Sequence, residues 1–294
     1  MSEELILSPT DALWHERRRE VYTASDMGLL FGIPGFGGRT LSDVGFEKRY
    51  GTTRSDKGTL STRLGTRLES IILDEAEQSL GTIIDRQRWV TAGQIGATLD
   101  GIATSDGCPV EAKTSGLLWK PDAEWGDSGD DIPSAICLQV TAQMIVTSAD
   151  MGHVAAIIGG RGFMLYEIPR SEPLIAEMVR RVAEFMVSLR SETAYPIPPT
   201  LETLKRLRRQ PKKVLPRSDA IEEARDRYES AKSANKATET DKEASQAALL
   251  ALLGDAEAAE CAGGMLTYYE QTNRYPAKLA SETSFRVLRY KKGG

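Results

Sequence analysis

Three charged residues near the middle of the chain have the types and spacing of a divalent-cation site. Asp100 ends an apolar run of strand length, and Glu111 and Lys113 lie on the next expected strand, after a turn signal at 105–107. Side chains two positions apart on a strand project from the same face, so the three charges can converge. Two hard carboxylates favour Mg²⁺, with Mn²⁺ as a substitute. The alternative is a solvated Glu111–Lys113 pair, which is common on strands.

A third carboxylate, Glu69, comes earlier, on an expected helix. Residues 65–80 have helical periodicity, and Glu69 lies on or beside the apolar stripe of that helix. A carboxylate that points inward needs a cation or hydrogen-bond donors. Glu69 is therefore either a member of the cation site or the partner of Arg63 or Arg67.

Two glutamines interrupt an otherwise apolar helix at 135–146. Gln139 and Gln143 are four positions apart, which places them on one stripe of the helix. Amides on so apolar a helix need polar partners, and metal-bound water or a nucleic-acid backbone would serve. Both glutamines are thus candidates for the same site.

Composition limits the class of protein. The 294 residues are enough for a sizeable core, and the formal net charge of −5 excludes a uniformly basic coat. It leaves open a DNA enzyme whose positive charge is concentrated on one face. The three scattered cysteines and the lack of an apolar span or leader predict a soluble cytoplasmic protein with no membrane partner.

The expected elements follow one another in the order that such a site requires. A helix, a three-stranded meander and a second helix precede a hairpin and a packing helix, and these occupy 65–80, 82–113, 135–146, 152–168 and 174–189. The proline-rich segment 196–199 ends this part, so the expected domains are 1–198 and 199–294. The second domain is expected to contain a helical hairpin (218–256) and a short β tail (263–292). The glycine-rich segment 32–64 is expected to be an exposed loop.

The residues above resemble the core of the PD-(D/E)XK nucleases, in which an Asp and a Glu-x-Lys lie on adjacent strands. Within that superfamily, residues 10–195 resemble the YqaJ-type viral recombinases, the lambda exonuclease-like group. Five blocks in the correct order carry the resemblance: Trp14–Arg18 with Tyr22–Asp26, Gly65–Glu69, Leu99–Gly101, Glu111–Lys113 and Leu138–Met144. The chain departs from the pattern at Leu99, where the family has proline. The implied fold class is α/β, a restriction-endonuclease-like core with a mixed central sheet flanked by helices.

The resemblance also implies an activity. It indicates a metal-dependent DNA exonuclease of phage-type recombination that hydrolyses phosphodiester bonds of linear double-stranded DNA from 5′ to 3′. The product would be a 3′ single strand for an annealing protein. Members of the group form ring-shaped homo-oligomers, a trimer in the best-known case. The competing readings are a catalytically silent DNA-end-binding or scaffold protein and an endonuclease of the same superfamily.

Individual roles follow from the same resemblance. The catalytic residues would be Asp100, Glu111, Lys113, Glu69 and Gln139, with Mg²⁺ held by Asp100, Glu111, Glu69 and the Ala112 carbonyl. Lys113 would orient or deprotonate the attacking water, which Gln139 helps to position. Arg18 and Ser25 match the family's pocket for the 5′-phosphate, with Thr98 near it, and Gln143 is a further candidate DNA contact.

Overall fold

The computed structural model forms two compact units. The first unit comprises residues 1–37 and 55–193, and the second comprises 38–54 and 194–294. The structure describes residues 3–5, 12–35, 38–51, 60–116, 125–126, 132–189, 199–207, 209–233, 239–262, 264–274 and 282–292. The proline-rich boundary expected at 196–199 lies outside these ranges except for Pro199.

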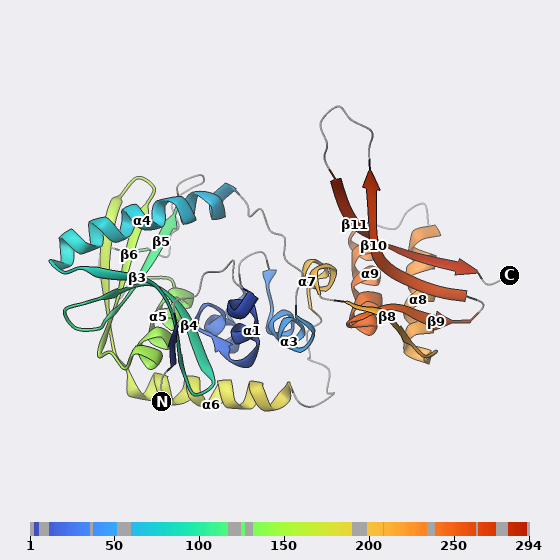
Figure 1. Ribbon diagram of the computed structural model, residues 1–294, viewed down its shortest axis with the longest axis horizontal. Coiled ribbons are helices and arrows are strands. Elements are labelled where there is room, and N and C mark those ends of the chain that lie inside the picture. The colour runs from blue at the N-terminus through green and yellow to red at the C-terminus, as the bar shows by residue number, and fades with distance from the viewer. Residues whose placement is uncertain are drawn as a thin grey trace. The chain divides into compact units, whose positions relative to one another are not determined.

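A mixed sheet organises the first unit (Figure 1). Its strands run in the order β1-β3-β4-β5-β6-β7, and β2 pairs with β4. Their bounds are β1 (Glu3–Leu5), β2 (Tyr22–Thr23), β3 (Ile84–Ala92), β4 (Ile95–Ala103), β5 (Pro109–Ser115), β6 (Met151–Ile158) and β7 (Gly162–Pro169). β5 and β6 are parallel because helix α5 (Ser134–Thr147) carries the chain back between them. The expected meander, crossover helix and hairpin are confirmed.

Helices cover both faces of this sheet. On one face, α4 (Leu60–Leu80) packs through Ile72 and Leu73 against Val110 and Ala155. On the other face, α5 packs through its apolar side chains against β6 and β7. Val110 points to the α4 face, so the next residue, Glu111, points to the α5 face. This alternation decides which residues can form a site together, and the predicted fold class is confirmed.

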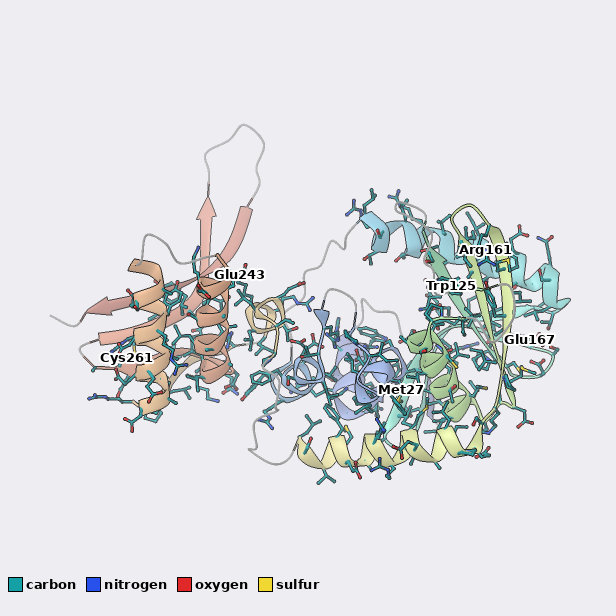
Figure 2. All side chains as sticks on the ribbon, turned by 180° about the vertical axis from the view of Figure 1, so that it is seen from behind. Met27, Trp125, Arg161, Glu167, Glu243 and Cys261 are labelled. Atoms are coloured by element: carbon teal, nitrogen blue, oxygen red, sulfur yellow. The ribbon has the colours of Figure 1, made fainter. Side chains whose placement is uncertain are left out.

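The first unit also contains a 3₁₀ turn and further helices. They are α1 (Ala12–Glu20), the 3₁₀ turn η1 (Ala24–Asp26), α2 (Met27–Leu30) and α6 (Glu172–Ser188). At the turn between β6 and β7, the Arg161 guanidinium donates to the carbonyls of Trp125 (2.5 Å) and Gly126 (2.9 Å) (Figure 2). Within the described residues, no helix combines the length and the hydropathy that crossing a bilayer would require.

The second unit combines helices with a four-stranded sheet of order β11-β10-β9-β8. Its helices are α3 (Leu41–Tyr50), α7 (Leu201–Arg206), α8 (Asp219–Ser233) and α9 (Glu239–Leu253). Its strands are β8 (Gln210–Leu215), β9 (Ala256–Cys261), β10 (Gly264–Arg274) and β11 (Glu282–Lys292). The predicted helical hairpin is α8 with α9, and the predicted tail is the antiparallel pair β10–β11. β8 and β9 extend that pair into a larger sheet than expected.

Helix α3 corrects the expectation of a loop over 32–64. Thr40 and Asp43 form a capping box, in which the Thr40 hydroxyl accepts from the Asp43 N–H and Asp43 accepts from the Thr40 N–H. The other oxygen of Asp43 accepts from the N–H (2.5 Å) and the hydroxyl (2.9 Å) of Thr200, the N-cap of α7. One fully buried carboxylate thus ties together the first turns of two helices that are far apart in sequence.

Candidate active site

Strands β4 and β5 bring the three central charges together. Asp100 lies on β4, and its Oδ2 accepts a hydrogen bond from the backbone N–H of Ala112 at 2.9 Å. Ala112 lies between Glu111 and Lys113 on β5. The bond therefore fixes Asp100 beside the Glu-x-Lys pair, as the strand alternation predicts.

Glu111 is the centre of a polar network on the α5 face. The carboxylate is almost completely buried, with 3% of the residue exposed. Its Oε1 accepts from Lys113 Nζ (2.5 Å) and from Gln139 Nε2 (2.6 Å), and its Oε2 accepts from Gln143 Nε2 (2.5 Å). Lys113 Nζ also donates to Gln139 Oε1 at 3.2 Å. The two glutamines that share one stripe of α5 thus converge on one carboxylate.

The position of Gln143 differs from its expected contact with DNA. Only 1% of the residue is exposed, and its amide nitrogen is used by Glu111. Its Oε1 is buried and has no hydrogen-bond partner. Gln143 therefore supports Glu111 from within the core and presents no surface to a nucleic acid.

Electrostatics link Glu69 on α4 to the same group. Burial raises the pKa of Glu69, a hydrogen bond from the Gln87 side chain lowers it, and the charge of Glu111 raises it again. Burial also raises the pKa of Asp100 well above its usual value, and the charges of Glu111 and Glu69 add to this rise, which Lys113 opposes. Three carboxylates from α4, β4 and β5 therefore share one field, with one ammonium among them.

The pKa of Lys113 is raised as well, but by the neighbouring charges and not by burial. Burial alone lowers the pKa of its ammonium, but Glu111, Asp100 and Glu69 outweigh that effect and raise the pKa overall. The group therefore stays protonated at neutral pH. Its side chain retains 27% of its exposure and borders an open cleft of about 280 Å³, which Glu69 and Thr114 also line.

Gln87 is a member of this site that the sequence analysis missed. It lies on β3 between the paired positions Arg86–Gly101 and Arg88–Leu99, which places it opposite Asp100. Its backbone has φ of +54°, a left-handed conformation that is costly for a residue with a Cβ. Its side chain reaches Glu69. No sequence pattern marks this residue, because its conformation and its partner depend on strand pairing and on a distant helix.

The donor set fits a hard divalent cation. Carboxylate oxygens are the ligands Mg²⁺ prefers, and a bound cation would oppose the burial and the charges of Glu111 and Glu69 that raise the pKa of Asp100. In the part of the chain that the structure describes, however, the trio of potential ligands whose donor atoms all lie within 4.8 Å is Asp106, Cys108 and His153. The three carboxylates are more widely placed, with Lys113 bonded at Glu111.

The residues expected at the 5′-phosphate lie on three elements: α1 (Arg18), η1 (Ser25) and β4 (Thr98). The Arg18 guanidinium stacks over the Trp14 ring at 4.5 Å from its centroid and donates to the Thr23 hydroxyl at 3.4 Å. Trp14 Nε1 donates to Thr98 Oγ1 at 2.9 Å, two residues before Asp100. Ser25 is exposed on η1. Arg18 and Thr98 are thus joined through one indole ring, and their binding roles stay predictions.

Comparison with known proteins supplies a family. Residues 13–150 match the model of the YqaJ-like viral recombinase domain. No curated protein matches the chain. The solved structures similar to it include an alkaline exonuclease from Laribacter hongkongensis, with 18% identity, a TM-score of 0.47 and coverage of 61% of this chain and 92% of that one. They also include a phage-related exonuclease from Haemophilus somnus 129PT, with 13% identity, a TM-score of 0.45 and coverage of 57% and 93%. Residues 13–150 are thus similar to the YqaJ-like viral recombinase domain.

Proposed function

We propose that this protein is a divalent-metal-dependent exonuclease that degrades one strand of linear double-stranded DNA. The observation that carries the proposal is the convergence of Glu69 from α4, Asp100 from β4 and Glu111 from β5 around Lys113, within the residues similar to the YqaJ-like domain. Asp100, Glu111, Glu69 and the Ala112 carbonyl would hold Mg²⁺. When bound, the cation supplies positive charge that offsets the carboxylates and polarises the scissile phosphate.

The chain's own residues divide the remaining work. Because its pKa is raised, Lys113 carries a proton at neutral pH, so we assign it to stabilising negative charge on the phosphate and orienting the attacking water. This choice disfavours the alternative that Lys113 removes a proton from that water. Gln139 bridges Glu111 and Lys113, and we assign it the positioning of both.

The direction of digestion rests on the residues near Trp14. We assign Arg18, with Ser25 and Thr98, to the 5′-phosphate at a DNA end, which gives 5′ to 3′ digestion and a 3′ single strand as product. Arg18 is partly exposed and held in orientation by the Trp14 ring, as a phosphate-binding guanidinium requires. A single-strand annealing protein would take up this product, and a ring-shaped homo-oligomer, such as a trimer, would keep the enzyme on its DNA.

One digestion experiment tests the activity and its direction. A linear duplex is labelled separately at each end of each strand, with or without 5′-phosphate, and incubated with Mg²⁺ or with EDTA. We expect mononucleotide release that starts at 5′ ends, is faster with 5′-phosphate and stops in EDTA. A closed circular duplex should stay intact, and its cleavage would indicate an endonuclease.

Matched variants connect the activity to the site. Lys113→Ala should abolish cleavage but leave DNA binding unchanged. The control Lys242→Ala removes an exposed lysine of α9 and should change neither cleavage nor DNA binding. Unchanged cleavage by Lys113→Ala would refute the assigned site. Binding of DNA ends without cleavage by the unaltered protein, at any divalent metal tested, would instead indicate a DNA-end-binding module.

A further inference from the structure

A second group of potential metal ligands lies outside the carboxylate cluster. One donor atom each from Asp106, Cys108 and His153 lies within 4.8 Å of the other two. Cys108 and His153 are each only 6% exposed, and Asp106 is exposed at the surface. The group thus has two buried donors and one that opens to solvent, which provides a path of entry for an ion.

The fold builds this arrangement in advance. Gly107 has φ of +74°, which turns the chain so that Asp106 and Cys108 lie on the same side of the hairpin. The Asp106 carboxylate accepts from the Cys108 N–H at 3.0 Å, and the Ala103 N–H donates to the Cys108 carbonyl at 2.9 Å. The parallel register of β5 and β6 pairs Val110 with His153, so His153 faces the same side as Val110.

One ring nitrogen points independently to a missing partner. His153 Nδ1 is buried and has no hydrogen-bond partner in the structure. A buried imidazole nitrogen without a partner is costly, and coordination of a cation would satisfy it. Glu167 on β7, labelled in Figure 2, lies opposite His153 in the β6–β7 register and adds negative charge to its surroundings.

We propose that Asp106, Cys108 and His153 bind a zinc ion at a site separate from the carboxylate cluster. Thiolate, imidazole and carboxylate are the ligands that Zn²⁺ prefers, and water would complete a tetrahedron. Ligand atoms around a tetrahedral zinc lie roughly 3.3–3.8 Å apart, so donors within 4.8 Å of one another need to approach by about 1.5 Å at most. A dication with one thiolate and one carboxylate leaves the buried site neutral.

The side chains of Glu111 and His153 point to opposite faces of the sheet. Glu111 bonds to α5, whereas His153 and Val110 face α4. The zinc ion would join the β4–β5 turn to the start of β6, three residues before Glu111. Its role is therefore structural: it would fix the hairpin that carries Asp100 and Glu111. The proposal does not depend on the proposed nuclease activity.

Metal uptake at this site has a chemical signature. Burial, together with Asp106, raises the pKa of the Cys108 thiol to about 11, so the thiol is protonated in the metal-free protein. Formation of the sulfur–metal bond breaks the S–H bond and releases that proton to solvent. Loading should therefore release about one proton per chain at neutral pH.

Cobalt is a suitable spectroscopic probe. The full-length, reduced, metal-free protein is titrated with Co²⁺ in excess Mg²⁺, which fills the oxygen-only site. We expect a thiolate-to-cobalt charge-transfer band in the near ultraviolet that saturates at one Co²⁺ per chain, and Zn²⁺ should displace it. Cys108→Ser and His153→Gln should lose the band. Asp106→Asn, at an exposed position that folding tolerates, should weaken affinity at least about tenfold.

The control is Cys261→Ser, which changes another buried thiol but in the second unit. It should leave the band and the affinity unchanged. The proposal is overturned if the unaltered protein gives no band, if Cys108→Ser keeps it, or if Cys261→Ser removes it. Unchanged affinity in Asp106→Asn would also overturn it, because that variant separates loss of a ligand from loss of folding.

Discussion

Glu111 in the first unit and Asp43 in the second are both buried carboxylates with several hydrogen-bond donors, and the two differ in a way that separates structure from function. Asp43, in the second unit, is fully buried and accepts from neutral N–H and hydroxyl groups of Thr40 and Thr200. Glu111, in the first unit, is 3% exposed and accepts from a lysine and two glutamines. Glu111 also has the carboxylates of Glu69 and Asp100 in its field.

The neutral donors from two helix caps satisfy the charge of the Asp43 carboxylate, so that group needs no bound cation. Like charges that meet in a poorly solvated place are costly, and a protein accommodates them where a ligand will offset them. Asp43 thus serves folding, whereas under the proposed function the repulsion among Glu69, Asp100 and Glu111 would be offset by a bound cation. The comparison predicts opposite effects when each group is altered.

The largest effect should come from Glu111→Gln. The variant keeps the shape of the side chain but removes a charge on which a cation and Lys113 both depend. Cleavage of labelled duplex in Mg²⁺ should fall by at least about 10³-fold, while far-ultraviolet circular dichroism stays unchanged. Substantial residual activity would mean that Glu111, like Asp43, is only a structural acceptor.

Asp43→Ala should show the reverse pattern. Removing the acceptor leaves the first turns of α3 and α7 with buried unpaired donors, which should lower the free energy of unfolding of the second unit by about 2–4 kcal/mol. All four tryptophans lie in the first unit. In urea, the circular dichroism transition should therefore shift and the tryptophan fluorescence transition should not. Equal shifts of both would contradict independent roles.

Gln87→Gly tests whether local strain serves the carboxylate cluster. Glycine adopts φ of +54° freely, so the first unit should gain about 0.5–1 kcal/mol of stability, measured by tryptophan fluorescence in urea. Loss of the donor to Glu69 should at the same time slow cleavage about tenfold. A variant that is both more stable and equally active would remove Gln87 from the site.

The smallest effect concerns the pH dependence of stability. The folded-state pKa of Asp100 is raised above its usual 3.8, so the metal-free folded protein binds more protons than the unfolded chain above that value. Stability of the first unit in EDTA should fall as the pH rises through this window, and Asp100→Asn should flatten the fall. Mg²⁺ should remove it in the unaltered protein. A rise of stability with pH would contradict the comparison.

The local periodicity of the sequence predicted much of this site. Alternation along β5 placed Glu111 and Lys113 on one face, and the i, i+4 spacing of Gln139 and Gln143 placed both amides on one stripe of α5. The structure brings these residues together because short-range geometry alone decides which face each occupies. Gln143 shows the limit of this approach. Periodicity predicts on which face of α5 its side chain lies, but not that other residues bury that face.

Features that depend on the pairing of distant strands could not be predicted from local sequence periodicity. The conformation of Gln87 and the meeting of Cys108 with His153 result from strand register, which no local pattern specifies. Helix α3 is different, because the Thr40-x-x-Asp43 capping box was a readable signal. The glycine content of the surrounding segment led instead to the prediction of a loop.

Residues 38–54 belong to the second unit although 55–193 return to the first, so the chain passes from one unit to the other and back. A fragment cut at residue 198 would keep α3 but lose Thr200 and the core cluster against which Phe46 and Tyr50 of α3 pack. A clean dissection therefore needs two changes: a short linker in place of 38–54 in the amino-terminal fragment, and a graft of that helix onto the carboxyl-terminal fragment. The same interleaving means that neither half could have been gained or lost by a single end-to-end fusion.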